Sequence, residues 1–480
     1  MLDARHPASP IDTETAIPRG VPGAEAPDSR TRVVEAVEDR TAAGIAAAIN
    51  RLIRAGSLRE GERLPTVRDL AGALGVSPST VSDAWQALGA VGAVQPRGRA
   101  GTFVTEGVDR ERPRRFLGIS AAPAEHGLDL STGTPDPELL PSLKEALSRV
   151  TQHQGPWTTS YLDAPVLPEL EEYLAGTWPF APERLTVVDG ALDALSRIVD
   201  RAVHLGDRVV VEDPCFPPLA DMLEHAGAEL LPVPMDDAGI VTEALTEALA
   251  ADPVVVFLQP RAQNPTGTSM SVARAVELAG VLRGHRALVV EDDHSGDIAT
   301  GADVSIGTHL PDRVVHIRSY SKSHGPDLRI AAVGGCARVI DPLVTSRLLG
   351  PAWTSRLLQA VLLELLTDPD AIGAVRRARS QYAMRGLALR AGLARHGVTS
   401  TPGDGINAWV EVADERAALT VLAAQGVKVA PGGPFQIRPS GTDHIRVTTG
   451  LLHEDDTEQL QWVISALVEA AVAGRGQRGI

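Results

Sequence analysis

The sequence predicts two folded parts: a small N-terminal winged helix-turn-helix of α+β type, and a larger α/β domain that ends in a small α+β subdomain. Three observations support this prediction. Residues 41–104 show helical apolar spacing around a tight turn, short apolar runs alternate with helical segments from about residue 185, and the two regions differ in net charge. A chain of 480 residues also suffices for two to four domains of about 100–200 residues.

The cysteine content and the hydropathy pattern exclude several classes of protein. Cys215 and Cys336 lie far apart and lack metal-ligand spacing, so we expect neither a disulfide framework nor a metal site. No run of about 18 apolar residues is free of charges, glycine or proline, and the N-terminus lacks a signal pattern. The sequence therefore predicts a cytoplasmic protein without a membrane partner.

The formal net charge of −16 is unevenly distributed. Residues 41–104 carry seven arginines against four acidic residues, a local charge of +3 that leaves −19 for the rest of the chain. A basic module attached to an acidic body can approach nucleic acid at one end only.

The first 105 residues predict a tail and a DNA-binding fold. Residues 1–40 show no sustained apolar period, and we expect a flexible tail there. Residues 41–54 form one amphipathic helix, and a second helix follows Pro65 and ends at a turn at Gly75. Ser77 is a good N-cap for a third helix over 78–88, and two extended runs around residues 96–101 predict a β-hairpin wing with arginines at its tip. We therefore predict a winged helix-turn-helix over residues 41–105.

Residues 106–128 are charged and weakly periodic, which is typical of a linker. Residues 129–480 form the larger domain, in which alternating strands and helices predict a mostly parallel sheet covered by helices. Beyond about residue 350, a long helical stretch and short mixed strands predict a small α+β subdomain that extends to about residue 475.

The chain holds only three lysines, Lys144, Lys322 and Lys428. Lys322 follows a predicted strand within Ser-Tyr-Ser-Lys-Ser-His-Gly, where hydroxyls and a nearby arginine crowd one amine. Positive charge and partial burial favour the neutral amine that a Schiff base requires. A loop at the carboxyl end of a parallel strand is also where open α/β sheets bind ligands.

Other segments offer groups that suit a phosphorylated pyridine aldehyde. The helix that begins at Gly190 and Ala191 can bind a phosphate dianion with its free N–H groups, and Asp292 ends an apolar strand, where it can pair with a pyridine nitrogen. The remaining candidates are Asn264 for the ring hydroxyl, Phe216 for the ring face, and Ser319 and Arg329 for the phosphate.

The order GALDAL, EDPCFP, QNPTG, EDDH and SYSK, with Arg329 seven residues after Lys322, resembles fold type I pyridoxal-phosphate enzymes of the aspartate aminotransferase group. The resemblance covers residues from about 128 to the end. It implies pyridoxal 5'-phosphate as the cofactor, Lys322 as the Schiff-base (aldimine) lysine, and the roles given above for the other residues. It also implies that Arg446 holds a carboxylate and that Tyr161 reaches the cofactor phosphate of a partner subunit, in a homodimer with or without exchanged domains.

Two departures from this pattern bear on the site. His294 stands where the family usually has a tyrosine, so we expect a different contact to the cofactor's ring oxygen. Val166 replaces the glycine that usually closes the stretch after Tyr161, which affects the expected contact with the partner subunit.

The segment from Glu62 to Val81 and the wing residues Gly101 to Val104 resemble the GntR superfamily, and the fusion with an aminotransferase-like domain is typical of its MocR subgroup. This resemblance implies a repeated half-site in double-stranded DNA as the target. The expected DNA-contacting residues are Arg68, Ser79, Thr80, Ser82, Arg97, Gly98 and Arg99, with Gln86 as a further base-reading residue because Pro78 replaces the usual arginine.

The sequence therefore predicts a bacterial, nucleoid-associated transcription regulator that senses pyridoxal phosphate or an amino compound through Lys322. The alternative is a working aminotransferase with an accessory DNA-binding module. The fused helix-turn-helix favours the regulator, since a transaminase needs no residues 41–104. Pyridoxal phosphate itself, an amino acid and an ω-amino acid all remain open as the effector.

Overall fold

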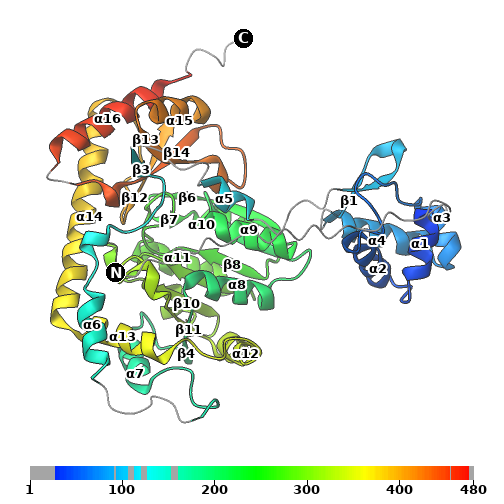
Figure 1. Ribbon diagram of the computed structural model, residues 1–480, viewed down its shortest axis with the longest axis horizontal. Helices are drawn as coiled ribbons and strands as arrows, with labels where there is room; N and C mark the ends of the chain where they lie inside the picture. The colour runs from blue at the N-terminus through cyan, green and yellow to red at the C-terminus, as the bar shows by residue number, and fades with distance from the viewer. Residues whose placement is uncertain are drawn as a thin grey trace, which may run out of the picture. The chain divides into compact units, whose positions relative to one another are not determined.

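The computed structural model (Figure 1) describes residues 28–90, 93–105, 113–119, 127–152, 160–453 and 456–474, without the side chains of Ala43, Arg54, Ala87, Ala90 and Arg99. The chain divides into two compact units, Met1–Asp109 and Arg110–Ile480. Each unit buries hydrophobic residues of its own.

The small unit is a winged helix-turn-helix, as predicted. Its elements are α2 (Ala42–Arg54), α3 (Val67–Leu74), α4 (Pro78–Ala90), β1 (Val94–Pro96) and β2 (Thr102–Val104). Thr41 and Thr66 cap α2 and α3 through their side chains. Gly75 ends α3 with φ of 66°, a left-handed conformation that glycine adopts at little cost, and this turn redirects the chain into α4. The two strands pair antiparallel and form the wing.

The prediction of a flexible tail over residues 1–40 is wrong for α1 (Ser29–Ala36), while residues 1–27 lie outside the described part. Asp28 caps α1, and Val33 is fully buried in the core of the small unit. Arg32 forms an ion pair with Glu62 and donates to the Ser57 carbonyl. The sequence pattern missed this helix because only one of its eight residues is buried, which leaves no apolar period.

The large unit contains an eight-stranded sheet in the order β4-β11-β10-β9-β8-β5-β6-β7. Strands β10, β9, β8, β5 and β6 are parallel, whereas β11 runs antiparallel to both of its neighbours and β7 runs antiparallel to β6. The strands are β4 (Arg184–Val188), β5 (Arg208–Asp213), β6 (Glu229–Asp236), β7 (Gly239–Ile240), β8 (Val255–Leu258), β9 (Leu288–Asp293), β10 (Val314–Ser319) and β11 (Ala331–Gly335). The mostly parallel sheet is confirmed.

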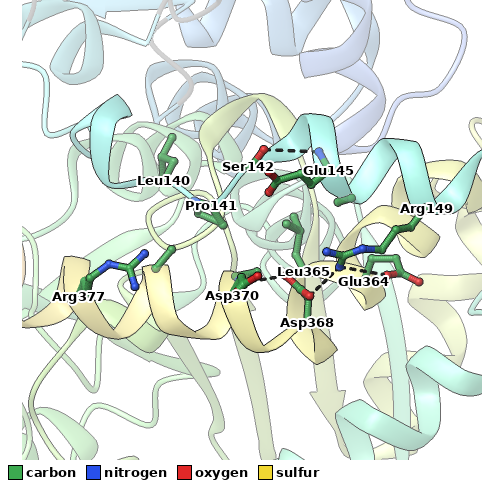
Figure 2. A pocket seen from close by; sticks show the side chains of 13 residues that line it. Leu140, Pro141, Ser142, Glu145, Arg149, Glu364, Leu365, Asp368, Asp370 and Arg377 are labelled. Carbon is green, nitrogen blue, oxygen red and sulfur yellow. Dashed lines mark hydrogen bonds and ion pairs between the residues drawn. The ribbon is translucent and has the colours of Figure 1, made fainter.

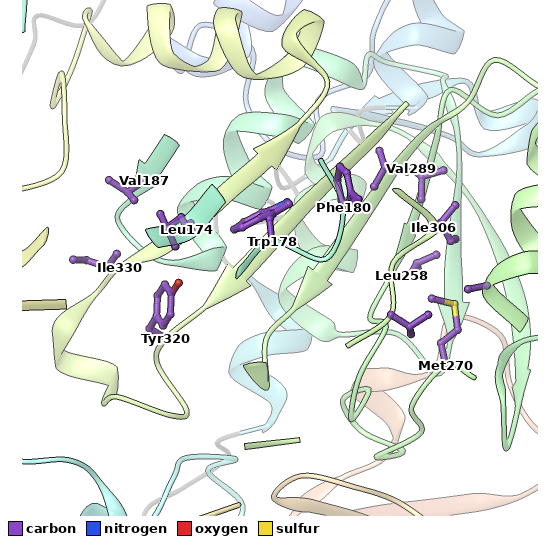
Figure 3. Packing of buried hydrophobic residues seen from close by; sticks show 14 of the residues in the cluster. Leu174, Trp178, Phe180, Val187, Leu258, Met270, Val289, Ile306, Tyr320 and Ile330 are labelled. Atoms are coloured by element: carbon purple, nitrogen blue, oxygen red, sulfur yellow. The ribbon is translucent and has the colours of Figure 1, made fainter. Parts of the chain in front are cut away.

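Helices cover both faces of this sheet. One buried cluster packs beneath α8 (Ala191–Ala202), α9 (Pro217–Ala226) and α12 (Ala337–Arg347). The other cluster packs beneath α6 (Leu143–Val150), α7 (Pro168–Thr177), α10 (Thr242–Leu249), α11 (Val272–Leu282) and α13 (Arg356–Thr367). Figure 3 shows part of this second cluster, where Trp178 and Phe180 lie among aliphatic side chains. Because the central parallel strands β8, β9 and β10 are buried on both sides, the carboxyl ends of these strands remain for polar chemistry.

A second sheet, in the order β12-β14-β13-β3, forms the small subdomain. Its strands are β3 (Leu128–Leu130), β12 (Asn407–Val412), β13 (Val427–Pro431) and β14 (Asp443–Thr448), and its helices are α15 (Glu415–Ala424) and α16 (Thr457–Val472). Helix α14 (Pro369–Arg395) runs from α13 to this subdomain (Figure 1).

The expected linker over residues 106–128 is partly ordered, which corrects that prediction for the described residues. Helix α5 (Arg114–Ile119) packs on α9, where Arg115 pairs with Glu224 at 2.9 Å and its amide donates to Asp221. Leu128 begins β3, which pairs in parallel with β13. These contacts come from residues more than 100 positions away, so local composition could not reveal them.

A polar pocket of about 240 Å³ lies between α6 and the start of α14 (Figure 2). Arg149 closes one side of it by an ion pair of 2.7 Å with Asp368, the residue that caps α14. The ion pair beside this pocket therefore connects α6 to α14, the helix that leads to the small subdomain. Among the described helices, none combines the length and apolar character needed to cross a bilayer.

We expect Val33→Ala to lower the stability of the small unit by about 2 kcal/mol, because it leaves a cavity between α1 and the helices beneath it. Chemical unfolding of the full chain, followed by a probe in the small unit, measures this effect. Glu35→Ala on the exposed side of the same helix is the control, and equal stability of the two variants would contradict the packing of α1.

Candidate functional site

The predicted site residues converge at the carboxyl edge of the large sheet. Asp292 lies at the end of β9, and Ser319 ends β10 just before Lys322. Strand β4 runs parallel to β10 across β11, so the turn from β4 into α8 reaches the same edge. The loops after β5 and β8 supply Phe216 and Asn264. The arrangement therefore brings most of the candidates around one point, as the strand order requires.

Lys322 is the central amine of this edge. Its Nζ donates to the carbonyl oxygen of Gly133. Burial and the positive charge of Arg446 lower the pKa of Lys322 to about 8, while Asp292 acts in the opposite direction. About a tenth of the amine is thus neutral and nucleophilic at pH 7, far more than for an exposed lysine.

Asp292 is 3% exposed and has only one of its carboxylate oxygens bonded. Its Oδ2 accepts from Gln259 Nε2 at 2.8 Å, while Oδ1 is buried without a partner among the described residues. Burial raises the pKa of Asp292 to about 6. A buried acceptor without a donor is unfavourable, so this oxygen indicates the position of a donor from a ligand. Sequence analysis missed Gln259, whose only signal is a polar residue directly after an apolar strand.

Gly190 and Arg329 form a cradle at the start of α8. Gly190 has φ of 95°, and a Cβ atom there would lie 2.8 Å from Arg329 Nη2. Ala191 is the first residue of α8, whose unpaired N–H groups face the same place. Arg329 Nη2 donates to the Asp189 carbonyl at 3.2 Å. These groups suit a phosphate dianion, and a side chain at position 190 would fill the cradle.

Two serines extend this cradle. The hydroxyl of Ser319 lies 2.8 Å from that of Ser321, which sequence analysis did not propose. The spacing of two residues at the end of a strand was the available signal, since alternate side chains point to the same side.

Arg446 and Asn264 lie on the small-subdomain side of Lys322. Arg446 is 3% exposed, donates to Asn264 Oδ1 at 3.1 Å and to the Ser131 carbonyl, and lies 5.2 Å from the centre of the Phe435 ring. Burial lowers its pKa to about 10, and no carboxylate pairs with it in the described part of the chain. A buried guanidinium without a counter-ion is suited to bind a carboxylate from solution. Because Arg446 occupies Asn264 Oδ1, the amide NH₂ of Asn264 is left as a donor.

Three other predicted residues make contacts within the large unit. His294 points its Nε2 at the Ala262 carbonyl, 2.9 Å away, and burial lowers its pKa to about 4, so the ring is neutral. Phe216 starts α9 and packs against the cluster beneath that helix. Tyr161 is 85% exposed, and its ring contacts Trp353 at 5.8 Å between ring centres.

The predicted DNA-contacting residues lie on the small unit. Arg68, Ser79 and Ser82 are exposed on α3 and α4, and Thr80 is half-buried. The Ser77 hydroxyl lies 2.7 Å from that of Ser79 and 2.8 Å from that of Thr80, so these groups are pre-arranged at the start of α4. In the wing, the Arg97 guanidinium lies 5.0 Å from the centre of the Phe103 ring, and Gly98 begins a short turn. The Arg99 side chain lies outside the described residues.

The sequence matches two protein families. Residues 125–463 match the class I and II aminotransferases, and residues 41–104 match the bacterial regulatory proteins of the gntR family. Residues 1–40, 105–124 and 464–480 lie outside the two matches.

The chain is similar in sequence to regulators that it matches over most of their length. The vitamin B6 salvage pathway transcriptional repressor PtsJ of Salmonella typhimurium is 35% identical, over 88% of this chain and 97% of its own length. The probable rhizopine catabolism regulatory protein MocR of Rhizobium meliloti is 28% identical, over 72% of this chain and 75% of its own. The solved structure of LysN, an α-aminoadipate aminotransferase of Thermus thermophilus, has a TM-score of 0.65 at 24% identity, over 74% of this chain and 97% of LysN. This last similarity shows the fold alone.

We expect the Lys322 amine to react with an acylating reagent with a midpoint at about pH 8. Arg446→Gln should raise this midpoint because it removes a positive neighbour, and Asp292→Asn should lower it because it removes a negative one. Peptide mass spectrometry across a pH series measures the reaction, with exposed Lys144 as an internal control. Identical pH profiles of Lys322 in the three proteins would contradict the electrostatic account.

Proposed function

This chain belongs to the MocR subgroup of the GntR family, and we propose that it is a transcription regulator whose DNA binding responds to pyridoxal phosphate held at Lys322. The cofactor of its class I and II aminotransferase domain is pyridoxal phosphate. The observation that carries the proposal is the buried Asp292 Oδ1, which lacks a donor at the edge where Lys322 lies. The GntR match over residues 41–104 favours a regulator over an aminotransferase with an accessory module.

Each group of the site has a role in this proposal. Pyridoxal phosphate supplies an aldehyde that bonds to amines and a pyridine ring that withdraws electrons. Lys322 Nζ is the nucleophile, Asp292 pairs with the ring N–H, and the Asn264 amide donates to the ring oxygen. Phe216 stacks on the ring, and His294 contributes a neutral imidazole next to the ring oxygen. The cradle of Gly190, Ala191, Ser319 and Arg329 holds the phosphate, and Ser321 adds a hydroxyl to it.

Two ligands are compatible with this site as the effector. The role of PtsJ as a repressor of a vitamin B6 salvage pathway favours pyridoxal phosphate itself. Arg446 favours an additional amino compound with a carboxylate, because its buried guanidinium has no counter-ion among the described residues. An amine with a carboxylate would compete with Lys322 for the cofactor while Arg446 holds its other end. This same geometry is compatible with residual transaminase activity.

The DNA target is a repeated half-site bound by two copies of the small unit. Arg68 and Arg97 contact phosphates, and Ser79, Thr80 and Ser82 read bases from the start of α4 in the major groove. Gly98 and Arg99 at the wing tip approach the backbone. A protein with this role works on the nucleoid in the cytoplasm.

The large unit forms a homodimer in this proposal. Tyr161 and Leu162 are 85% and 87% exposed, and Leu349 is 95% exposed, so large apolar side chains gather where Tyr161 contacts Trp353. Tyr161 is then available to the cofactor phosphate of the partner subunit. Such exposure is unusual for a surface that stays in water.

Lys322→Ala should abolish the response of DNA binding to pyridoxal phosphate. In the wild-type protein we expect the cofactor to change the Kd for promoter DNA by about fivefold or more, the range typical of coupled sites. Fluorescence anisotropy with and without cofactor measures this change. Lys144→Ala is the matched control and should respond as the wild type does. An equal response in Lys322→Ala would rule out Lys322 as the sensor.

Arg68→Ala and Arg97→Ala should each lower the slope of log K against log salt concentration by about 1, because each removes one phosphate contact. Arg51→Ala is the control, since Arg51 lies on α2 and its guanidinium donates to the Ala36 carbonyl. Unchanged slopes for both test variants would place the DNA on another surface.

A further inference from the structure

Arg347, the last residue of α12, is an arginine that the proposed function does not use. It is 1% exposed and is among the largest fully buried side chains of the described residues. Its guanidinium lies 2.7 Å from Asp193 Oδ2, 3.1 Å from Asp189 Oδ2 and 3.0 Å from Thr354 Oγ1. Removal of a charge from water is costly, so a buried guanidinium needs partners that compensate this cost, as the two carboxylates and the hydroxyl do here.

One side of this network is the start of α8. Asp189 precedes Gly190, and Asp193 lies in the first turn of the helix, where it accepts from the Asp189 amide at 3.2 Å. Thr354 Oγ1 also donates to Asp189 Oδ1 at 2.8 Å. Two carboxylates beside a cradle for a phosphate dianion would weaken its binding by repulsion. Arg347 pairs with both carboxylates, and Arg197 also pairs with Asp193 at 2.8 Å, so the two arginines offset this repulsion.

The other side of the network is the segment after α12. The Ala352 amide donates to the Arg347 carbonyl at 2.7 Å, and Arg347 Nε donates back to the Ala352 carbonyl at 3.4 Å. Trp353, between Ala352 and Thr354, contacts the exposed ring of Tyr161. Arg356 lies 5.7 Å from the Trp353 ring centre and donates to the Ala164 carbonyl, which ties this segment to the chain after Tyr161.

Two short stretches carry exposed apolar side chains and meet where the Tyr161 ring contacts Trp353. We call them together the Trp353 surface, which comprises Tyr161, Leu162, Leu348, Leu349 and Trp353. Leu348 and Leu349 directly follow Arg347, in the turn that its carbonyl helps to close through a bond from the Gly350 amide at 2.9 Å. One guanidinium therefore contacts both the helix start that would hold the phosphate and the turn that carries this surface.

We propose that Arg347 is a positioning residue that couples occupancy of the phosphate cradle to self-association through the Trp353 surface. The inference rests on the proposed cofactor site and homodimer. The arrangement in which Arg347 holds both carboxylates reduces their repulsion of a phosphate, so an occupied cradle would favour it, and the same arrangement orders the turn from Leu348 to Thr354. By linkage, a second copy bound at the Trp353 surface then tightens cofactor binding by the same factor.

Two variants test the coupling. Arg347→Gln removes the charge, and Thr354→Val removes only the hydroxyl that joins Arg347 to Asp189, so it serves if the first variant does not fold. Arg313→Gln is the matched control, since Arg313 is a largely buried arginine that caps α11 through the Leu282 carbonyl at the opposite edge of the sheet. The Kd for pyridoxal phosphate is measured by absorbance titration. The dimer dissociation constant is measured by sedimentation with and without the cofactor.

In the wild-type and control proteins we expect the cofactor to tighten the dimer by about fivefold or more. In Arg347→Gln the Kd for the cofactor should rise by about tenfold, and the cofactor should tighten the dimer by a smaller factor than in the wild type. In Thr354→Val the coupling should fall in the same direction by a smaller factor. Wild-type coupling in either folded variant, or no coupling in the wild type, would overturn the inference. Failure of the wild type to bind the cofactor would instead count against the proposed function.

Discussion

The large unit buries charged groups at one edge of its sheet without giving all of them partners. Lys322, Asp292 and Arg446 lie within one polar region, yet Asp292 Oδ1 has no donor and Arg446 has no carboxylate among the described residues. Burial of such groups costs free energy that the protein alone does not recover. The rest of the unit can be understood as the means of keeping them there: five parallel strands end at this edge, and helices seal both faces of the sheet.

The two units divide the work of a regulator in physical terms. Residues 41–104 of the small unit carry a local charge of +3 and expose hydroxyls and arginines, which suit the phosphate backbone and base edges of DNA. The large unit is acidic, and its buried site holds the positive groups of Lys322 and Arg446, which suit a small anionic ligand. A ligand that binds one unit can affect the other only if it favours one arrangement of the paired units, and in the proposed homodimer that arrangement depends on the contact surface between the subunits.

Much of this organisation could be predicted from the sequence because it depends on local patterns. Apolar spacing and the cap at Ser77 predicted the helix-turn-helix, and the short apolar runs from about residue 185 predicted the alternation of strands and helices. The missed elements depend on distant contacts. Strand β11 is rich in alanine and glycine and owes its place to β4 and β10, while β6 contains two prolines that disguise it. Helix α1 buries a single valine, and the partly ordered linker is held by α9 and β13.

The candidate site shows the same division. Ordered motifs predicted Lys322, Asp292, Asn264 and Arg446, which the structure brings together. Gln259 and Arg347 could not be predicted, because their importance comes from the carboxylates that they meet in space. His294 could be identified as a departure, but its orientation toward the Ala262 carbonyl depends on a left-handed residue in another loop.

The most direct test of the central claim uses the small number of lysines in the chain. The purified protein is incubated with pyridoxal phosphate, the resulting bond is fixed by borohydride reduction, and the labelled peptide is identified by mass spectrometry. The account predicts that the label is found on Lys322, the lysine next to the unpaired carboxylate oxygen. A label on Lys144 or Lys428 instead, or no label at all, would contradict the claim that this edge of the sheet is the cofactor site.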